Sequence, residues 1–449
     1  MPPPSPPAGK DLSQRGIFRF WVPLAATWVM MAAEGPFLAA VIARLADPTI
    51  SLAAYGVAIA YAVLVESPVI MLMSAATALI EDEASYRRLR NFANLLNAFA
   101  TSLLLITLIP PVHRALFFGV LGLPEEVAAQ TYGALWCFLP WPAAIGVRRF
   151  LQGVMIRAGR TRLVAYGTVI RLLAMATSAI VFGPVLGLPG SWVGGAALST
   201  GVVVEAIAAR IMARPSIREV LGTAPAGDST GLSYREIGSF YYPLLLTSLI
   251  GLAVGPMVTF FMGRSVAPVE SLAVFPVVHS LLFVFRALGL SFQDASIALL
   301  GRGREGVPEL SRFGRRMGFA ITALLVAIAF TPLADVWFMT VSGLSAELTA
   351  YAITPLRIVV LLPLAGVWLS FERGVLMRNR RTRPITWATA AEVVVIAAVF
   401  IVCGWVLDMV GVTAAAIALL FGKLMSTLYL VPPTRLCLRE VGAPSRLDE

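Results

Sequence analysis

The chain has 449 residues, of which 58% are hydrophobic and only 13% are charged, and its mean hydropathy is +0.82. An ordinary soluble domain carries about 25% charged residues, so this composition excludes a soluble globular protein and indicates an all-α polytopic membrane protein. The formal net charge is +10, which suits nucleic acid or anionic lipid until the positions of the basic residues are considered. The three cysteines are scattered and lack CxxC spacing, so we expect neither disulfides nor a metal site.

Residues 1–16 are polar and rich in proline, and they predict an N-terminal tail. The apolar run that follows is too long for the h-region of a cleavable signal, so we expect it to stay in the membrane. Apolar runs bounded by Gly, Pro and charged residues predict twelve transmembrane helices, at 17–43, 51–79, 91–111, 127–149, 163–183, 190–212, 236–263, 270–299, 314–334, 348–373, 384–408 and 411–435. Residues 213–235 form a polar linker, and residues 436–449 form a second tail.

Basic residues collect on one side of these spans. Most of the 35 Lys and Arg side chains lie in the two tails, in the linker and in the loops that follow even-numbered spans. The positive-inside rule makes this side cytoplasmic, so both termini are predicted to be cytoplasmic. The positive charge is therefore mainly a topology signal with some attraction to anionic lipid, and nucleic acid is not an expected partner.

One arginine-rich phrase occurs twice. FLQGVMIRAGRTR at 150–162 returns as FERGVLMRNRRTR at 371–383, and FWVPL at 20–24 returns as FYYPL at 240–244. The offset between matching positions is nearly the same in both cases and persists along the whole chain, which indicates an internal repeat.

The repeat divides the spans into two six-helix bundles, 17–212 and 236–435. Six is an even number, so both bundles enter and leave on the same side, and the pseudo-two-fold axis that relates them must lie along the membrane normal. Such bundles enclose a central cleft that suits alternating-access transport. The loops are too short for a soluble catalytic domain and there is no GxxxxGK[ST] motif, so the sequence predicts neither an enzyme nor an ATP-driven pump, and no cofactor.

Two ionisable residues near the middle of their spans occupy equivalent repeat positions. Glu66 and Arg286 have the same offset as the FWVPL and FYYPL segments, and one half has the acid where the other has the base. A charge at the bilayer centre costs at least about 2.5–3.5 kcal/mol unless it is paired or hydrated. One hypothesis is that the two pair across the pseudo-two-fold axis as a gate that opens when substrate competes for Arg286. The alternative is that each is neutralised inside its own bundle.

Arg171 and Glu392 repeat this exchange of acid and base at equivalent positions nearer the cytoplasmic side. They are candidates for gating or coupling, and a structural ion pair or separate local partners fits them better than contact with substrate. Glu34 precedes Gly35 and Pro36, which can unwind or kink the first span. An acid at such a bend suits a proton or cation site, and a hydrogen-bonded Glu at an inert kink fits the sequence as well.

Three further residues are candidates for binding an anion. His279 lies two helical turns before Arg286 and therefore on the same helical face, where its unperturbed pKa near 6.5 would allow proton linkage. Arg149 ends the fourth span and Arg357 lies in the tenth. Arginine binds phosphate and carboxylate through a planar fork of donors. In a cleft these arginines would select anions, whereas at the rim Arg149 and its neighbour Arg148 would extend to the membrane surface, which their position favours.

Several motifs resemble the progressive ankylosis protein family, in order and spacing along most of the chain. They are FRFWVPL at 18–24 followed by Glu34, LAAYG at 52–56, FPVVH at 275–279, PLRIVVLLPL at 355–364 and GVLMRNRRT at 374–382. The short tails are typical of a prokaryotic relative, which places the chain in a bacterial inner membrane. The family is similar in fold to the multidrug and oligosaccharidyl-lipid exporter superfamily.

The resemblance implies a small polyvalent anion as substrate, because animal members are associated with export of pyrophosphate, nucleoside triphosphate and citrate. Glu34, His279 and Arg357 occupy positions that match the family's pattern. Gly255 stands where the family has an arginine before the proline of the seventh helix, so one anion contact is missing here.

Together these observations predict a monomeric secondary transporter that exports a polyvalent anion by alternating access. Arg286 and Arg357 would hold the anion, and Glu34, Glu66 and His279 would couple its movement to protons or sodium ions. One alternative is an exporter of organic cations or drugs that uses Glu34 and Glu66 as coupling acids. Another is a flippase for a lipid-linked diphosphate precursor, whose head group would suit a basic cleft.

Overall fold

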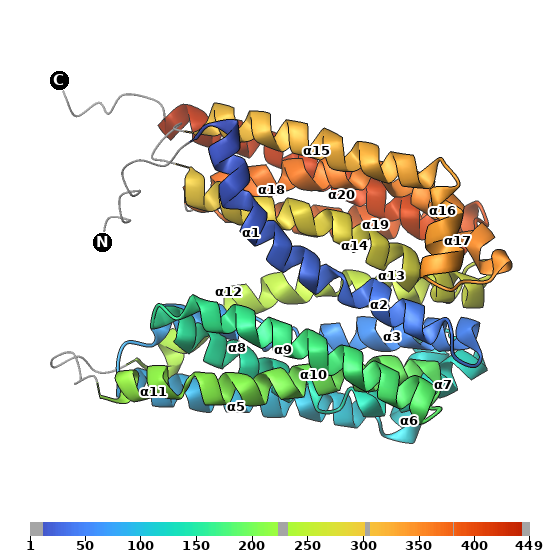
Figure 1. Cartoon of the computed structure of the whole chain (residues 1–449), viewed down its shortest axis with the longest axis horizontal. Helices are drawn as coiled ribbons and strands as arrows, with labels where there is room; N and C mark the ends of the chain where they lie inside the picture. Colours follow the sequence, from blue (N-terminus) through green and yellow to red (C-terminus); the bar gives the residue numbers. More distant parts are fainter. Residues whose placement is uncertain (1–11, 223–231, 301–305, 380, 442–449) are drawn as a thin grey trace. The chain divides into compact units, whose positions relative to one another are not determined.

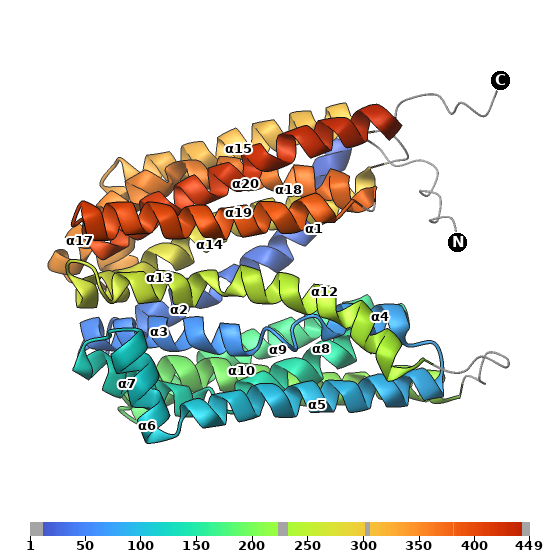
Figure 2. The same ribbon diagram turned by 180° about the vertical axis from the view of Figure 1, so that it is seen from behind.

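The computed structural model describes residues 12–222, 232–300, 306–379 and 381–441. Parts of the predicted tails, 1–16 and 436–449, and of the predicted linker, 213–235, lie outside the described residues. Helices account for almost all of the described chain (Figure 1, Figure 2).

The helices of the N-terminal half are α1 (Gln14–Ala32), α2 (Glu34–Ile42), α3 (Pro48–Val65), α4 (Leu72–Leu79), α5 (Glu83–Thr107), α6 (Pro110–His113), η1 (Arg114–Val120), α7 (Glu125–Cys137), α8 (Trp141–Arg157), α9 (Thr161–Ile180), η2 (Val181–Val185), α10 (Gly190–Met212) and α11 (Arg214–Leu221). Those of the C-terminal half are α12 (Tyr234–Leu252), α13 (Val254–Met262), α14 (Pro268–Leu299), α15 (Val307–Ala329), α16 (Leu333–Asp335), η3 (Val336–Val341), α17 (Ala346–Ile358), η4 (Val359–Leu361), α18 (Leu362–Arg378), α19 (Arg383–Phe400), η5 (Ile401–Val406) and α20 (Gly411–Val441). The labels η1, η2, η3 and η5 mark π-helices, and η4 is a 3-10 turn.

Ten helical segments of the described residues are long and apolar enough to cross a membrane. The number is eleven if α15 and the segment Leu333–Val341, which meet at 88°, form one bent span. The protein is thus a multi-pass membrane protein, as its composition predicts. The fourth predicted span, 127–149, corresponds to α7 and α8, which are 13 and 17 residues long and are separated by a break at 138–140. A count of twelve requires these two helices to cross the membrane together.

The second span is broken in the N-terminal half and continuous in the C-terminal half. The prediction of one helix over 51–79 was wrong, because α3 ends at Val65 and α4 begins only at Leu72. Pro68 has no N–H and disfavours helical geometry for the residue before it, so the chain turns between the two helices. The equivalent positions in α14 contain no proline, and that helix is continuous from Pro268 to Leu299.

The described helices form two compact units, and each unit is built from segments that are separated in the sequence. Unit 1 comprises the described parts of Met1–Pro36, Val277–Val341 and Thr349–Glu449, and unit 2 comprises those of Phe37–Pro276 and Ser342–Leu348. The first helix of each sequence half is therefore exchanged, because α1 belongs to unit 1 whereas α12 and α13 belong to unit 2. The division into bundles 17–212 and 236–435 describes the repeat, and as a division into domains it stays a prediction.

Hydrogen bonds from repeat-equivalent positions hold the exchanged helices. In unit 2, Tyr241 Oη of α12 donates to the carbonyl of Pro68 at 2.5 Å, and Ser248 Oγ donates to that of Ser67 at 3.1 Å. Both carbonyls lie in the turn between α3 and α4, where the helical donors are missing, so α12 satisfies groups that an apolar environment would otherwise leave unpaired.

Unit 1 repeats this arrangement with different side chains. Trp21 and Trp28 of α1 are the repeat equivalents of Tyr241 and Ser248. Trp21 Nε1 donates to Ser291 Oγ at 2.8 Å, and Trp28 Nε1 donates to Asp294 Oδ2 at 3.0 Å. Both acceptors lie on the continuous helix α14, so here side chains take the place of the freed carbonyls of unit 2.

The repeated arginine-rich phrase also contributes a repeated ion pair. Arg160 Nη2 lies 3.4 Å from Glu219 Oε2 in unit 2, and Arg381 pairs with Glu440 in unit 1. Each pair joins a turn between two spans to the helix that ends the repeat. The side chains are largely exposed, so each pair contributes only about 0–1 kcal/mol.

Glycine in the same phrase permits close helix packing. A Cβ atom on Gly153 of α8 would lie 2.5 Å from the carbonyl oxygen of Met73 on α4. A Cβ on the equivalent Gly374 of α18 would lie 2.9 Å from Ser296 Cβ on α14. These distances leave no room for a side chain, so glycine recurs where α8 and α18 approach their neighbours.

Replacing Tyr241 by Phe tests the role of α12 at the broken helix. The variant leaves the Pro68 carbonyl without its donor, and we expect a loss of about 1–3 kcal/mol of stability, measured as unfolding of the purified protein in detergent. Tyr242→Phe is the matched control, because Tyr242 is 61% exposed. Equal stability of the two variants would contradict this role.

Candidate functional site

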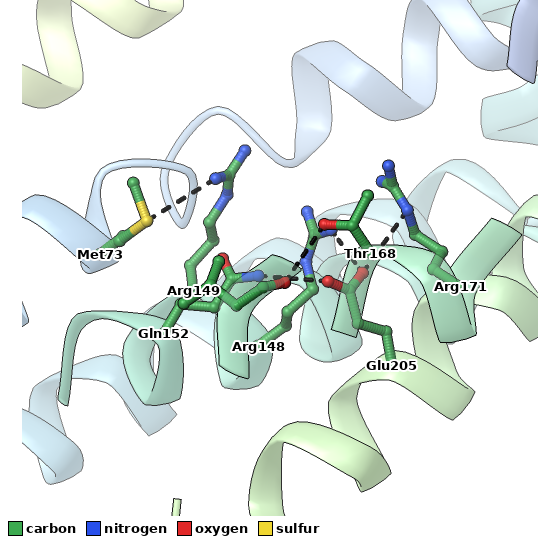
Figure 3. Close-up of polar contacts among 8 residues, drawn as sticks. Met73, Arg148, Arg149, Gln152, Thr168, Arg171 and Glu205 are labelled. Carbon is green, nitrogen blue, oxygen red and sulfur yellow. Dashed lines mark hydrogen bonds and ion pairs between the residues drawn. The ribbon is translucent and has the colours of Figure 1, made fainter. Parts of the chain in front are cut away.

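A buried polar cluster lies in unit 2 on α8, α9 and α10, three helices that run beside one another (Figure 1). Glu205 of α10 is its centre and has no solvent exposure. Its Oε2 accepts a hydrogen bond from Arg148 Nη1 at 2.7 Å and lies 3.5 Å from Arg171 Nε. Its Oε1 accepts from Gln152 Nε2 at 3.2 Å (Figure 3). One carboxylate thus holds two arginines in place inside the bundle.

Arg149 is adjacent to Arg148 but is not held by Glu205. Its side chain extends toward α4, where Nη1 contacts the sulfur of Met73 at 3.9 Å (Figure 3). A thioether is a weak acceptor. The Nε of Arg149 is buried and has no hydrogen-bond partner among the described residues. Buried polar groups are normally paired, so this guanidinium is available to an anionic ligand.

Glu66 lies close to the same cluster. It follows the last residue of α3, is 6% exposed, and accepts a hydrogen bond from Trp141 Nε1 at the start of α8. Arg148, Arg149 and Arg171 all act on its charge. The local partners of Glu66 in unit 2 therefore agree with the interpretation that it is neutralised within its own bundle. Arg286 belongs to unit 1, so direct pairing of Glu66 with Arg286 stays a prediction.

A second polar cluster lies in unit 1 on α14, α18, α19 and α20. Lys423 of α20 forms an ion pair with Glu392 of α19. Arg373 of α18 donates from Nη2 to Thr389 Oγ1 at 3.4 Å, and Arg286 of α14 interacts electrostatically with Glu392. This cluster is the counterpart of the one in unit 2, although it uses different side chains.

The two clusters explain the exchange of charge between Arg171 and Glu392. Each of these equivalent residues has its partner on the next transmembrane helix of its own unit, Glu205 for Arg171 and Lys423 for Glu392. The polarity of the ion pair is thus reversed between the repeats. These separate local partners agree with the structural interpretation of both residues, and their role in gating stays a prediction.

The remaining sequence candidates lie apart from the cluster of unit 2. Glu34 is the first residue of α2, directly after the break at Ala33, and Gly35 beside it packs against Ser280 of α14. His279 and Arg286 interact electrostatically within α14, as expected for residues two turns apart. Arg357 donates from Nε to the carbonyl of Ala329 at 3.1 Å and lies over the ring of Phe330, so part of its donor fork is occupied.

The centres of the two clusters, Glu205 and Lys423, were not among the site candidates predicted from the sequence, and neither were Gln152 and Arg373. A signal for the last two was present, because they are equivalent positions at which the two copies of the repeated phrase disagree. Positions at which the two copies have different polar residues are therefore better indicators of the polar clusters than the arginines that both copies share.

Comparison with known proteins supports the fold. No family model matches the chain, and no curated protein matches it. A multidrug resistance MATE family transporter of the MOP superfamily in its inward-facing conformation is similar at 13% identity and a TM-score of 0.69, over 92% of this chain and 95% of that one. The lipid II flippase MurJ is similar at 13% identity and a TM-score of 0.72, over 94% and 90%.

A third similar structure is a MOP superfamily transporter from Pyrococcus furiosus, at 13% identity and a TM-score of 0.61, over 98% of this chain and 100% of that one. It is described as having a binding pocket of reverse polarity that suggests a different function. The chain has the fold of MOP superfamily transporters. The expected fold class is confirmed by this similarity, whereas the narrower resemblance to the progressive ankylosis family stays a prediction.

Glu205→Gln tests the central role of this carboxylate. Removal of its charge leaves Arg148, which is 4% exposed, without its partner, and breaking such a buried pair costs about 3–5 kcal/mol. Glu219→Gln is the control, because it breaks the exposed pair with Arg160 and should cost about 1 kcal/mol or less. Unfolding of both purified variants in detergent provides the measurement. A loss as small for Glu205→Gln as for Glu219→Gln would contradict the role.

Proposed function

We propose that this protein is a secondary transporter that exports a small polyvalent anion, of the pyrophosphate, nucleotide or citrate type. The observation that carries the proposal is the guanidinium of Arg149, which lies inside a membrane bundle with no oxygen acceptor among the described residues. Neighbouring Arg148 and Arg171 are both engaged by Glu205. An oxyanion at Arg149 would supply the missing acceptors through the two-donor geometry that guanidinium offers.

The balance of charge supports an anion over a cation. Arg148, Arg149 and Arg171 lie with two acids, Glu66 and Glu205, so the cluster of unit 2 carries one excess positive charge when all five groups are ionised. A charged side chain inside a membrane protein is costly unless it is paired or hydrated. An anionic substrate would offset this cost, whereas a cationic substrate would be repelled.

The proposed roles follow the position of each residue. Arg149 is proposed to contact the anion in unit 2. Arg286 and Arg357 are proposed to contact it in unit 1, where Arg357 has donors that Ala329 does not use. Glu34, Glu66 and His279 are proposed to couple anion movement to a proton or sodium gradient. Arg171 and Glu392 are each proposed to hold the polar cluster of their own unit together during alternating access.

The wider setting of the proposal follows from the sequence. The chain would work as a monomer in a bacterial inner membrane with both termini in the cytoplasm, and without a cofactor or catalytic reaction of its own. Its energy would come from gradients, since the sequence has no GxxxxGK[ST] motif.

A second candidate is a flippase for a lipid-linked diphosphate. The similarity to the lipid II flippase MurJ favours it, and a diphosphate head group would suit Arg149 equally well. An exporter of organic cations or drugs has support from the MATE neighbours in fold but not from the charge of the cluster. The Pyrococcus furiosus transporter is described as having a binding pocket of reverse polarity that suggests a different function, so similarity to the MATE transporters in fold does not by itself favour a cationic substrate.

Efflux from proteoliposomes tests the proposal. Vesicles containing the protein and loaded with labelled pyrophosphate or citrate should lose the anion faster than protein-free vesicles. Arg149→Gln should slow this efflux by about tenfold or more, because hydrogen bonds to charged groups contribute about 1.5–3 kcal/mol.

Arg157→Gln is the matched control for this experiment. Arg157 lies in the last turn of the same helix, is exposed, and donates only weakly to the Thr77 carbonyl at 3.4 Å. Arg157→Gln should therefore change the efflux rate by no more than about twofold, because only one weak hydrogen bond is lost. Transport of a cationic dye without any anion movement would contradict the proposal and favour the drug exporter, and movement of a lipid diphosphate alone would favour the flippase.

A further inference from the structure

We propose that unit 1 contains a second anion-binding site, formed by Arg373 and Lys423, in addition to the Arg149 site of unit 2. The inference rests on the proposed function and extends it, because each repeat would then bind an anion of this class. Neither residue was a candidate on sequence grounds. The support comes from repeat position, contacts and charge.

Arg373 occupies the repeat position of Gln152, one helical turn beyond the position of Arg149. Ser370 is the true equivalent of Arg149, since each directly precedes the phenylalanine that begins its copy of the repeated phrase. One turn of helix corresponds to a rise of about 5 Å. The equivalent helices α8 and α18 therefore each carry such an arginine, and the one on α18 lies one turn closer to the C-terminal end of its helix.

The contacts of Arg373 resemble those of Arg149. Its Nη2 donates to Thr389 Oγ1 at a long 3.4 Å, and its Nε is buried without a hydrogen-bond partner among the described residues. A guanidinium has five N–H donors, and buried donors are normally paired. In the part of the chain that the structure describes, the Nε of Arg148 in unit 2 is buried without a hydrogen-bond partner as well, but Arg148 differs in that its Nη1 donates directly to a carboxylate at 2.7 Å. Each repeat thus presents one inner arginine without a carboxylate partner at hydrogen-bond distance among the described residues.

The charges around Arg373 favour an anion. Arg286 acts electrostatically on Arg373, and both act on Lys423, so three cations lie together in unit 1. Glu392 is taken by the ion pair with Lys423, and Glu372 accepts a hydrogen bond from Trp368 Nε1 at 3.1 Å. Arg435 also acts on Glu372, so four basic and two acidic groups leave two excess positive charges when all are ionised, and unit 1 is basic, as unit 2 is.

The ligand class follows from these donors. Arg373 offers a planar fork for two oxygens, and Lys423, which also pairs with Glu392, adds a compact positive charge that interacts electrostatically with Arg373. This combination fits the oxygens of a phosphate or carboxylate group. A free anion and an anionic lipid head group share this chemistry, and the experiment distinguishes them by using pyrophosphate and phosphatidic acid as separate probes.

Equilibrium binding to the purified full-length protein tests the second site. Labelled pyrophosphate is titrated against the wild type, Arg149→Gln, Arg373→Gln and the double variant. We expect the wild type to bind two equivalents of pyrophosphate, each single substitution to weaken one of the two by about tenfold or more, and the double variant to lose both. Arg378→Gln, the repeat counterpart of Arg157→Gln on α18, is the control and should bind like the wild type.

Arg373→Lys separates ligand contact from structure. It keeps the charge but loses the fork, so it should bind more weakly than the wild type while its thermal unfolding in detergent stays unchanged. Competition by phosphatidic acid that disappears in Arg373→Gln but persists in Arg149→Gln would support the site with a lipid-borne ligand. A stoichiometry and affinity for pyrophosphate that are unchanged in Arg373→Gln, together with a loss in Arg149→Gln, would overturn the second site and leave the proposed function standing. Absence of pyrophosphate binding to the wild type would instead overturn both.

Discussion

Charged and polar groups inside an apolar bundle require partners, and this requirement explains most of the arrangement in both units. Pro68 interrupts the second span and frees two carbonyls, and α12 supplies hydroxyl donors to them. Glu205 binds Arg148 and Arg171, and Lys423 binds Glu392. Arg149 and Arg373 are partly buried, each with a buried Nε, and lack such a carboxylate partner among the described residues. We propose that a ligand supplies it, because an uncompensated charge is costly in a membrane.

The internal repeat gives the two units one plan with different chemistry. Positions that fix packing are retained, such as Gly153 and Gly374 at close helix approaches. Buried polar positions diverge, since Arg171 in one copy faces an acid while Glu392 in the other faces a base. The exchange of the first helices, with Trp21 and Tyr241 at equivalent contacts, couples the sequence halves. Packing is therefore what the two copies share, while their polar groups have become specialised.

Much of this could be predicted from the sequence. Hydropathy and repeat spacing predict the membrane class, the helices and the break before Gly35 and Pro36, because these depend on local composition and on proline geometry. The break at Pro68 was missed, since apolar residues on both sides hide it from hydropathy. Glu205 and Arg373 were not recognised as site residues because their role depends on which side chains meet between helices. That information is tertiary, and only the mismatch between the two copies of the repeat hinted at it.

The central claim is that buried excess positive charge selects a polyvalent anion. Its most direct test is the thermal stability of the purified wild-type protein with acetate, phosphate, pyrophosphate, citrate or the cation tetraphenylphosphonium, at constant ionic strength. Ligands that bind the native state raise its melting temperature by an amount that grows with their affinity and concentration. Stabilisation should increase with the negative charge of the anion, and the cation should give none. Stabilisation by tetraphenylphosphonium alone, with no effect of any anion, would contradict it.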